Sequence, residues 1–170
     1  MRFLMILALA AKAGYAAQPP AASDYRTLWR YQGTWQVTPK SHPAGSKPDV
    51  LINQCSVLSK FFACGQNVNG QPGGLVVFIP NGKPGHFYTQ TIMPEGRATG
   101  RDDLEISGEK WVYSSRRDEG GKTTFYRTTN TFSGKNHIHY EQAQSTDGSQ
   151  WTVQSSGDEV RVGAASANAR

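Results

Sequence analysis

Short runs of alternating apolar and polar residues, separated by turn residues, repeat along most of this chain. The clearest example is Asn136 to Ser156, where two extended runs flank Asp147-Gly148, a dipeptide that accepts positive φ at low cost. A second segment places Leu104 and Ile106 on one face, with acidic residues between and beside them. A period of two predicts antiparallel hairpins rather than helices.

The same pattern predicts about ten short strands and almost no helix. The expected strands are Gly33 to Thr38, Val50 to Leu58, Phe61 to Val68, Leu75 to Ile79, His86 to Met93, Arg101 to Ser107, Trp111 to Tyr113, Thr123 to Phe132, the two arms of the 136–156 hairpin, and Gly157 to Val162 at the end. A meander this long removes its exposed edges by closing on itself. We therefore predict an all-β fold, an antiparallel up-and-down barrel of about eight to ten strands.

A short helix is expected before the first strand. Ser23 is placed to cap a helix over Asp24 to Tyr31, with Leu28 and Trp29 as its apolar contacts.

The N-terminus has the residue order of a secretory signal. Arg2 precedes an apolar run from Phe3 to Ala11, small residues follow, and the run is too short to span a bilayer. We expect an exported protein, periplasmic or secreted, without stable membrane insertion; an N-terminus that is disordered or docked on the core is the alternative. The expected domains are a signal peptide over 1–17, a Pro/Ala linker over 18–22, a barrel over 23–163 and a flexible tail over 164–170.

The two cysteines are placed to form one disulfide. If Ser59-Lys60 is the turn of a hairpin, Cys55 faces Cys64 directly, and opposed Cα atoms in an antiparallel pair lie within disulfide range. An exported chain permits the bond. Two buried thiols are the alternative.

Length and charge limit the partners. The 170 residues suit one domain, and the formal net charge of +5 comes from bases scattered along the chain. Because a nucleic-acid surface favours a denser basic stripe, we expect no nucleic-acid partner. The oligomeric state is left open.

Gly33-Thr34-Trp35, opening the first strand of an exported meander after a short helix, resembles the start of the lipocalin or calycin barrels. The later segment 145–151, which reads Ser-Thr-Asp-Gly-Ser-Gln-Trp, is similar to the end of lipocalin-like secreted bacterial domains, many without an assigned function. The resemblance covers most of Tyr25 to Gly163. The Thr-Asp-Tyr motif of true lipocalins and a C-terminal helix are absent from the sequence.

The resemblance implies a structural role for three residues. In lipocalins the tryptophan of this motif packs at the closed end of the barrel, near an arginine of the last strand. Gly33 and Trp35 match the motif, and Arg161 is the candidate arginine.

One spacing in the chain is typical of metal ligands. His137, His139 and Glu141 share one strand face at a period of two. The opposite face carries Ile138 and Tyr140, which have the better claim on a barrel interior. With a two-residue turn at 147–148, Trp151 and Val153 would join that interior face. We therefore expect the histidines on the surface, no metal site and no cofactor.

Aromatic residues of the later strands are candidates to line a cavity, or to fill it. Arginines of this region can bind a carboxylate ligand or lie on the outer face and pair with acids. The ligand-binding candidates are Trp111, Tyr113, Tyr126, Arg127 and Tyr140.

The sequence contains no nucleophile elbow, phosphate loop or zinc-protease motif. We predict a lipocalin-like barrel that binds a small, mostly apolar molecule, rather than an enzyme. The alternatives are a secreted or envelope structural or interaction module with a filled barrel, and a small barrel enzyme of the cyclase or isomerase type.

Overall fold

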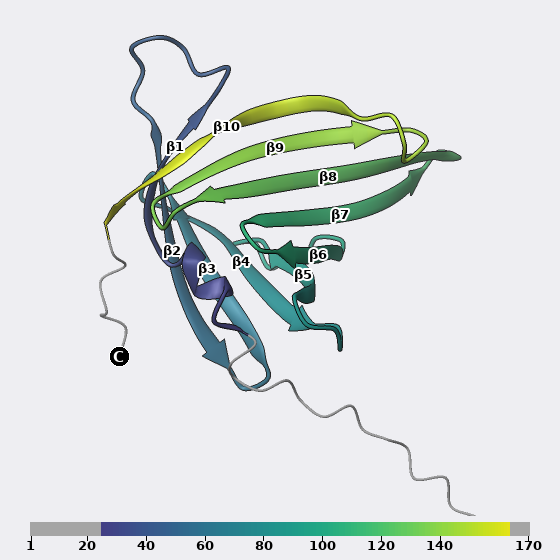
Figure 1. Ribbon diagram of the computed structural model, residues 1–170, viewed down its shortest axis with the longest axis horizontal. Helices are drawn as coiled ribbons and strands as arrows, with labels where there is room; N and C mark the ends of the chain where they lie inside the picture. The colour runs from purple at the N-terminus through teal and green to yellow at the C-terminus, as the bar shows by residue number, and fades with distance from the viewer. Residues whose placement is uncertain (1–24, 164–170) are drawn as a thin grey trace, which may run out of the picture.

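A computed structural model describes residues 25–163 of the chain, and within these residues ten antiparallel strands close into one barrel (Figure 1). Each strand pairs with its sequence neighbours, and β1 pairs with β10 to close the ring. The strands are β1 Gly33–Pro39, β2 Asp49–Leu58, β3 Phe61–Val68, β4 Gln71–Pro80, β5 His86–Ile92, β6 Asp102–Ser107, β7 Lys110–Glu119, β8 Lys122–Ser133, β9 His137–Ser145 and β10 Thr152–Gly163. The predicted all-β meander is confirmed. The predicted signal, linker and tail lie outside the described residues.

Successive connections lie at opposite ends of the barrel, and one end is closed by the segment before β1. This segment reaches across to the turns that follow β2, β6 and β8. Tyr25 Oη donates to the Lys60 carbonyl oxygen at 2.5 Å, and Arg30 Nη2 donates to Glu109 Oε2 at 2.5 Å and to the Gly134 carbonyl oxygen at 2.7 Å. The loops after β1, β3, β5, β7 and β9 surround the other end.

The helix expected over Asp24 to Tyr31 is a short 3-10 turn, η2 Leu28–Tyr31. Its carbonyl groups are bound by other parts of the fold rather than by a next helical turn. The Tyr31 carbonyl accepts from Trp35 Nε1 at 2.9 Å and from Asn53 Nδ2 at 3.2 Å, and Arg161 binds the carbonyls of Arg30 and Gln32. A longer α-helix would need those same acceptors.

Of the two apolar contacts expected from the helical turn, one is fully made. Leu28 is completely buried, whereas Trp29 remains 42% exposed and meets Phe62 edge-on, with ring centroids 5.1 Å apart. Among residues 25–163, no helix is long and apolar enough to cross a membrane.

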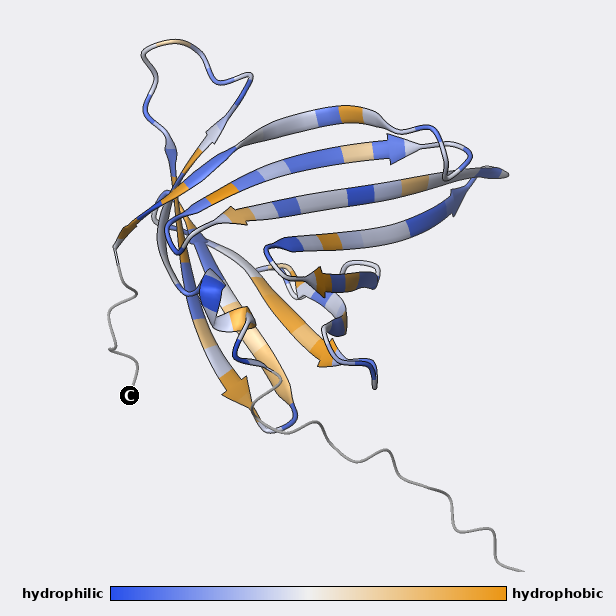
Figure 2. Ribbon diagram, in the orientation of Figure 1, coloured by the Kyte–Doolittle hydropathy of each residue, from blue (hydrophilic) through white to orange (hydrophobic). Residues whose placement is uncertain are grey.

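The core fills the closed half of the barrel, and its members come from almost every strand. The largest fully buried side chains are Trp35, Trp111, Tyr25, Phe62, Phe78, Leu28, Leu104 and Ile138. Apolar residues are concentrated on β3 and β4, while β7 to β10 carry many polar residues (Figure 2). The barrel therefore has one apolar wall and one polar wall.

The hairpin of β9 and β10 is built differently from the expected two-residue turn. Six residues connect the strands, and Asp147 Oδ1 organises them by accepting from the backbone N–H groups of Ser149 and Gln150, both at 2.8 Å. A register shift between Val153 and Ser155 follows. Because of the longer connection, Val153 lies opposite Ala143 rather than Gln142 and is 54% exposed, so its predicted placement in the interior was wrong.

The hairpin of β2 and β3 is confirmed in its register and in its disulfide. Ser59 takes positive φ in the turn, and Cys55 lies opposite Cys64. The two sulfurs are bonded, with Cα atoms 4.0 Å apart.

Candidate ligand-binding site

The floor of the barrel interior rests on Trp35 and Arg161, which are paired across β1 and β10. The Trp35 side chain is completely buried, and the guanidinium carbon of Arg161 lies 4.1 Å from its ring centroid. Gly33 makes room for this arginine, because a Cβ there would overlap Arg161 Nη1. These three residues hold the closed end together and leave the space above them to other side chains.

Tyr31 forms the boundary between the core and that space. Its ring packs edge-on against Trp111, with centroids 4.8 Å apart, and its hydroxyl lies 2.7 Å from the Tyr113 hydroxyl. Asn130 Nδ2 donates to Tyr31 Oη at 2.5 Å. One hydroxyl hydrogen lies between the two tyrosine oxygens, so whichever tyrosine accepts keeps its own hydrogen for another acceptor.

A cavity of about 350 Å³ lies beyond this tyrosine pair. It is lined by Tyr31, Leu51, Asn53, Cys64, Gln66, Val76, Phe78, Thr89, Thr91, Asp102, Tyr113, Thr128, Asn130, Gln142 and Glu159. The apolar members come from β2, β3 and β4, and most of the remainder carry hydroxyl, amide or carboxyl groups. The volume lies in the lower part of the range for small-molecule sites, about 300–1,000 Å³.

Two carboxyl groups face this cavity. Burial raises the pKa of Glu159 to about 7, and in residues 25–163 its side chain makes no hydrogen bond or ion pair. Burial also raises the pKa of Asp102, although a hydrogen bond from Ser115 and the charge of Arg117 oppose this shift. Burial raises the pKa values of Tyr31 and Tyr113 as well, so both phenols stay protonated at neutral pH. The phenols can thus donate hydrogen bonds into the cavity, and the Glu159 carboxyl group can bind a cation or take up a proton.

The ligand-binding candidates from the sequence lie in different places. Tyr113 lines the cavity, and Trp111 is completely buried in the core below it. Tyr126 is 38% exposed, with Arg117 5.2 Å from its ring, and Arg127 lies 4.1 Å from the Trp151 ring.

Tyr140 shares the interior face of β9 with Ile138 and Gln142, and its hydroxyl lies over Gly157, where a Cβ would come within 2.7 Å. Tyr113 is therefore the candidate that meets the cavity directly.

Sequence reasoning missed Glu159, Asp102 and Tyr31. Glu159 stands among charged residues, as a surface strand residue would, but it lies two positions before Arg161 on the same face. Period-two reasoning from the expected Trp35 and Arg161 pair would have placed it inside. Tyr31 belongs to the 3-10 turn, where alternation gives no orientation, so no comparable signal existed for it.

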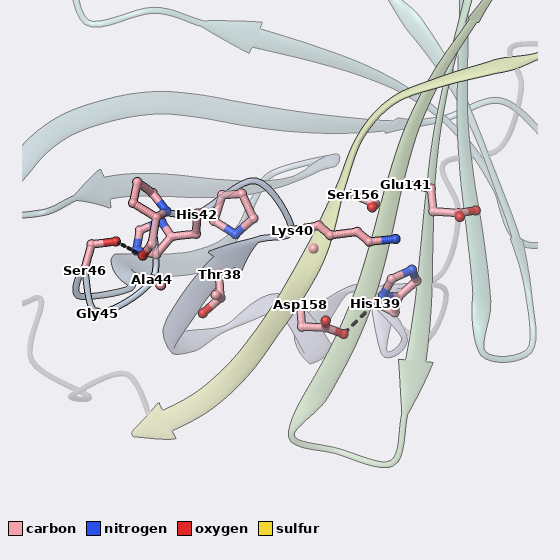
Figure 3. A pocket seen from close by; sticks show the side chains of 13 residues that line it. Thr38, Lys40, His42, Ala44, Gly45, Ser46, His139, Glu141, Ser156 and Asp158 are labelled. Carbon is pink, nitrogen blue, oxygen red and sulfur yellow. Dashed lines mark hydrogen bonds and ion pairs between the residues drawn. The ribbon is translucent and has the colours of Figure 1, made fainter.

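A second hollow, of about 620 Å³, lies on the outer surface between the β1–β2 loop and strands β9 and β10. Figure 3 shows loop residues such as Ala44 and Ser46 on one side and His139, Glu141 and Asp158 on the other. Several of its polar side chains already have partners within the protein. His42 Nε2 is 2.9 Å from the Lys47 carbonyl oxygen, for example. This open groove is a weaker candidate than the barrel interior.

The two histidines of the metal-like spacing lie on the outer face, as expected from Ile138 being completely buried. His137 and His139 both contact Asp158 Oδ1, at 2.9 Å and 3.1 Å, and their side chains are 39% and 45% exposed. In the described part of the chain, no group of three or more His, Cys, Asp or Glu side chains is arranged to hold a metal ion. Whether the protein works without a metal stays a prediction.

Comparison with known proteins finds a similar fold but does not assign the chain to a family. No family model matches the chain, and no curated protein matches it. Among solved structures, the crystal structure of Rv2717c from M. tuberculosis is similar, with 12% identity and a TM-score of 0.52, over 84% of this chain and 99% of that chain. At this identity the likeness concerns the barrel fold alone, and membership of a lipocalin-like family stays a prediction.

Proposed function

We propose that this protein is an exported barrel that binds a small molecule in its interior cavity. The observation that carries the proposal is the cavity of about 350 Å³ above Tyr31, lined by hydrogen-bonding side chains rather than filled by the core. Export is supported by the signal-like N-terminal sequence and by the disulfide between Cys55 and Cys64.

The lining argues for a ligand that is partly polar, rather than the mostly apolar molecule expected from the sequence. Leu51, Val76 and Phe78 offer an apolar surface, but Thr89, Gln142 and other polar groups occupy most of the remaining wall. A purely apolar ligand would bury these groups without partners, which is unfavourable. The same cavity weighs against the alternative of a filled barrel.

Native mass spectrometry of protein purified from its own host tests the proposal, because a bound molecule adds a discrete mass. Thr128→Phe would place a ring into the cavity, and Thr131→Phe, at an exposed position on the same strand, is the matched control. We expect wild type and the control to retain the same molecule and Thr128→Phe to lose it. Equal retention by both variants would place the ligand elsewhere and contradict the proposal.

A proton-transfer enzyme is the second candidate function. It is favoured by Glu159, whose pKa of about 7 suits a general base, facing the same cavity as a phenol that can stabilise an oxyanion. Among the described residues that line this cavity there is no arginine, so no guanidinium group would bind a negatively charged substrate there. Enzyme-dependent exchange of deuterium from solvent into the α-carbon of a small ketone, lost in Glu159→Gln, would support this activity; exchange that persists in that variant would contradict it.

A further inference from the structure

The charges around the cavity have one sign. Of the described residues that line it, Asp102 and Glu159 are acidic, and none is a lysine, arginine or histidine. The charge of Arg117 lowers the pKa of Asp102, and its guanidinium group lies over the Tyr126 ring, 5.2 Å from the centroid. Burial alone raises the pKa of Glu159, and no cation among the described residues opposes this increase. Within residues 25–163, the carboxyl group of Glu159 thus has no cation to pair with.

The apolar part of the lining comes from β2, β3 and β4, and it extends from Leu51, which β1 alone separates from β10, to Val76 and Phe78 farther around the ring. Glu159 is on β10, whereas Val76 and Phe78 are on β4, which three strands separate from β10 by the shorter way around the ring. The tyrosine pair and Asn130 lie toward the closed end. A ligand in this space therefore meets a carboxyl group on one side and an apolar wall on another.

We infer that the ligand is a small amphiphilic amine, whose ammonium group pairs with the Glu159 carboxylate and whose apolar part lies against Val76 and Phe78. This inference rests on the proposed binding function and names its ligand class. An organic ammonium supplies the missing counter-charge, and the attraction between two opposite charges is stronger in a poorly solvated space than in water. An anionic ligand would instead bring like charges together in a poorly solvated space.

Binding of an ammonium group favours the ionised form of Glu159 and so lowers its pKa in the complex. The other ionisable groups around the cavity are Asp102, Tyr31 and Tyr113, and both phenols titrate far above neutral pH. An aliphatic amine has a pKa near 10, so it stays protonated across the relevant range. Near neutral pH, binding of the amine should therefore release a proton from Glu159. The affinity for the amine should fall as the pH falls below about 7.

Three probes of similar size separate charge from shape: 2-phenylethylamine, 2-phenylethanol and 3-phenylpropionate. Isothermal titration of the mature protein at pH 8 should show the amine binding at least about tenfold more tightly than the alcohol, with the carboxylate weakest. Affinity for the amine should weaken roughly ten- to thirtyfold between pH 8 and pH 5.5, as Glu159 takes up a proton. Titration in two buffers of different ionisation enthalpy measures the released proton.

Glu159→Gln keeps the shape of the side chain and removes its charge. The variant should bind the amine and the alcohol about equally, whereas Glu141→Gln, an exposed residue on the outer face of β9, should behave as wild type. Thermal melting of Glu159→Gln verifies that it folds.

Wild type that binds amine and alcohol equally, or that binds none of the three probes, would overturn the inference, as would amine preference that persists in Glu159→Gln. A neutral molecule retained by protein from the native host would leave the binding function in place and remove only the amine.

Discussion

The Arg161 guanidinium stacks on the Trp35 indole at 4.1 Å and also binds the backbone carbonyl groups of Arg30, Gln32 and Lys135. One side chain thereby joins the last strand, the turn before β9 and the segment that closes the barrel. The Trp35 indole is the group on which the Arg161 guanidinium packs, and Trp35 Nε1 itself donates a hydrogen bond to the Tyr31 carbonyl oxygen.

Trp35→Ala should therefore nearly unfold the protein. The indole is completely buried, and removing a buried tryptophan side chain costs about 3–5 kcal/mol, a large share of the roughly 5–15 kcal/mol that stabilises a domain. Urea unfolding measures the change. Trp29→Ala is the control, since that residue is 42% exposed and should cost much less. Similar melting of Trp35→Ala and wild type would contradict this role for Trp35.

Glu159 should make the protein less stable as pH rises from about 4.5 to 7. Its pKa is raised from 4.5 to about 7 by burial, so in this range the folded chain holds a proton that the unfolded chain has released. The contribution is fully present below pH 4.5 and is lost by pH 7, with a magnitude on the order of 3 kcal/mol.

The difference in unfolding free energy between wild type and Glu159→Gln isolates this contribution from other titrating groups. Asp102 acts in the same direction, and the lowered pKa values of Asp118 and Asp147 act in the opposite direction at lower pH. We expect Glu159→Gln to gain stability relative to wild type as pH rises from 5 to 8. A difference that does not change with pH would show that Glu159 titrates normally.

Loss of the disulfide should destabilise the barrel without changing its fold. The bond closes a short loop, with a sequence separation of nine, which corresponds to roughly 2–3 kcal/mol. A Cys55→Ala, Cys64→Ala double variant should show this decrease in urea unfolding, and a reducing agent should affect wild type alone. Non-reducing peptide mapping of native protein that finds both thiols free would refute the bond.

Gly157→Ala should destabilise the junction of β1, β10 and β9. A Cβ there would lie 2.5 Å from the Thr38 carbonyl oxygen, 2.7 Å from the Tyr140 hydroxyl and 2.8 Å from Pro39 Cα. Overpacking of this kind typically costs about 1–3 kcal/mol, and backbone atoms cannot move aside as a flexible side chain can. Gly100→Ala is the matched control, because nothing lies within 4 Å of its Cβ position. Equal melting temperatures for the two variants would contradict the close approach.

The fold could be predicted from the sequence because its main determinants are local. Alternation sets the strands, and the Ser59-Lys60 turn sets the register that joins Cys55 to Cys64. The cavity could not be predicted in the same way. The floor of the cavity depends on the position of the Tyr31 hydroxyl, which is set only when the segment before β1 crosses the end of the barrel. The charge of the cavity depends on the burial of Glu159, and the mixed charges along β10 give no sign of that burial.

The pairing of β1 with β10 has a consequence for how the chain acquires its shape. These strands come from opposite ends of the described chain, yet they form a single ladder that completes the ring. Folding of such nonlocal ladders is slow, because the chain entropy lost on joining distant segments precedes the energy that the contact returns. A growing chain cannot close this ring until its final strand has been synthesised. Until then β1 and the last strand already formed present unpaired edges, so the interval before closure is the one in which this protein is most exposed to aggregation.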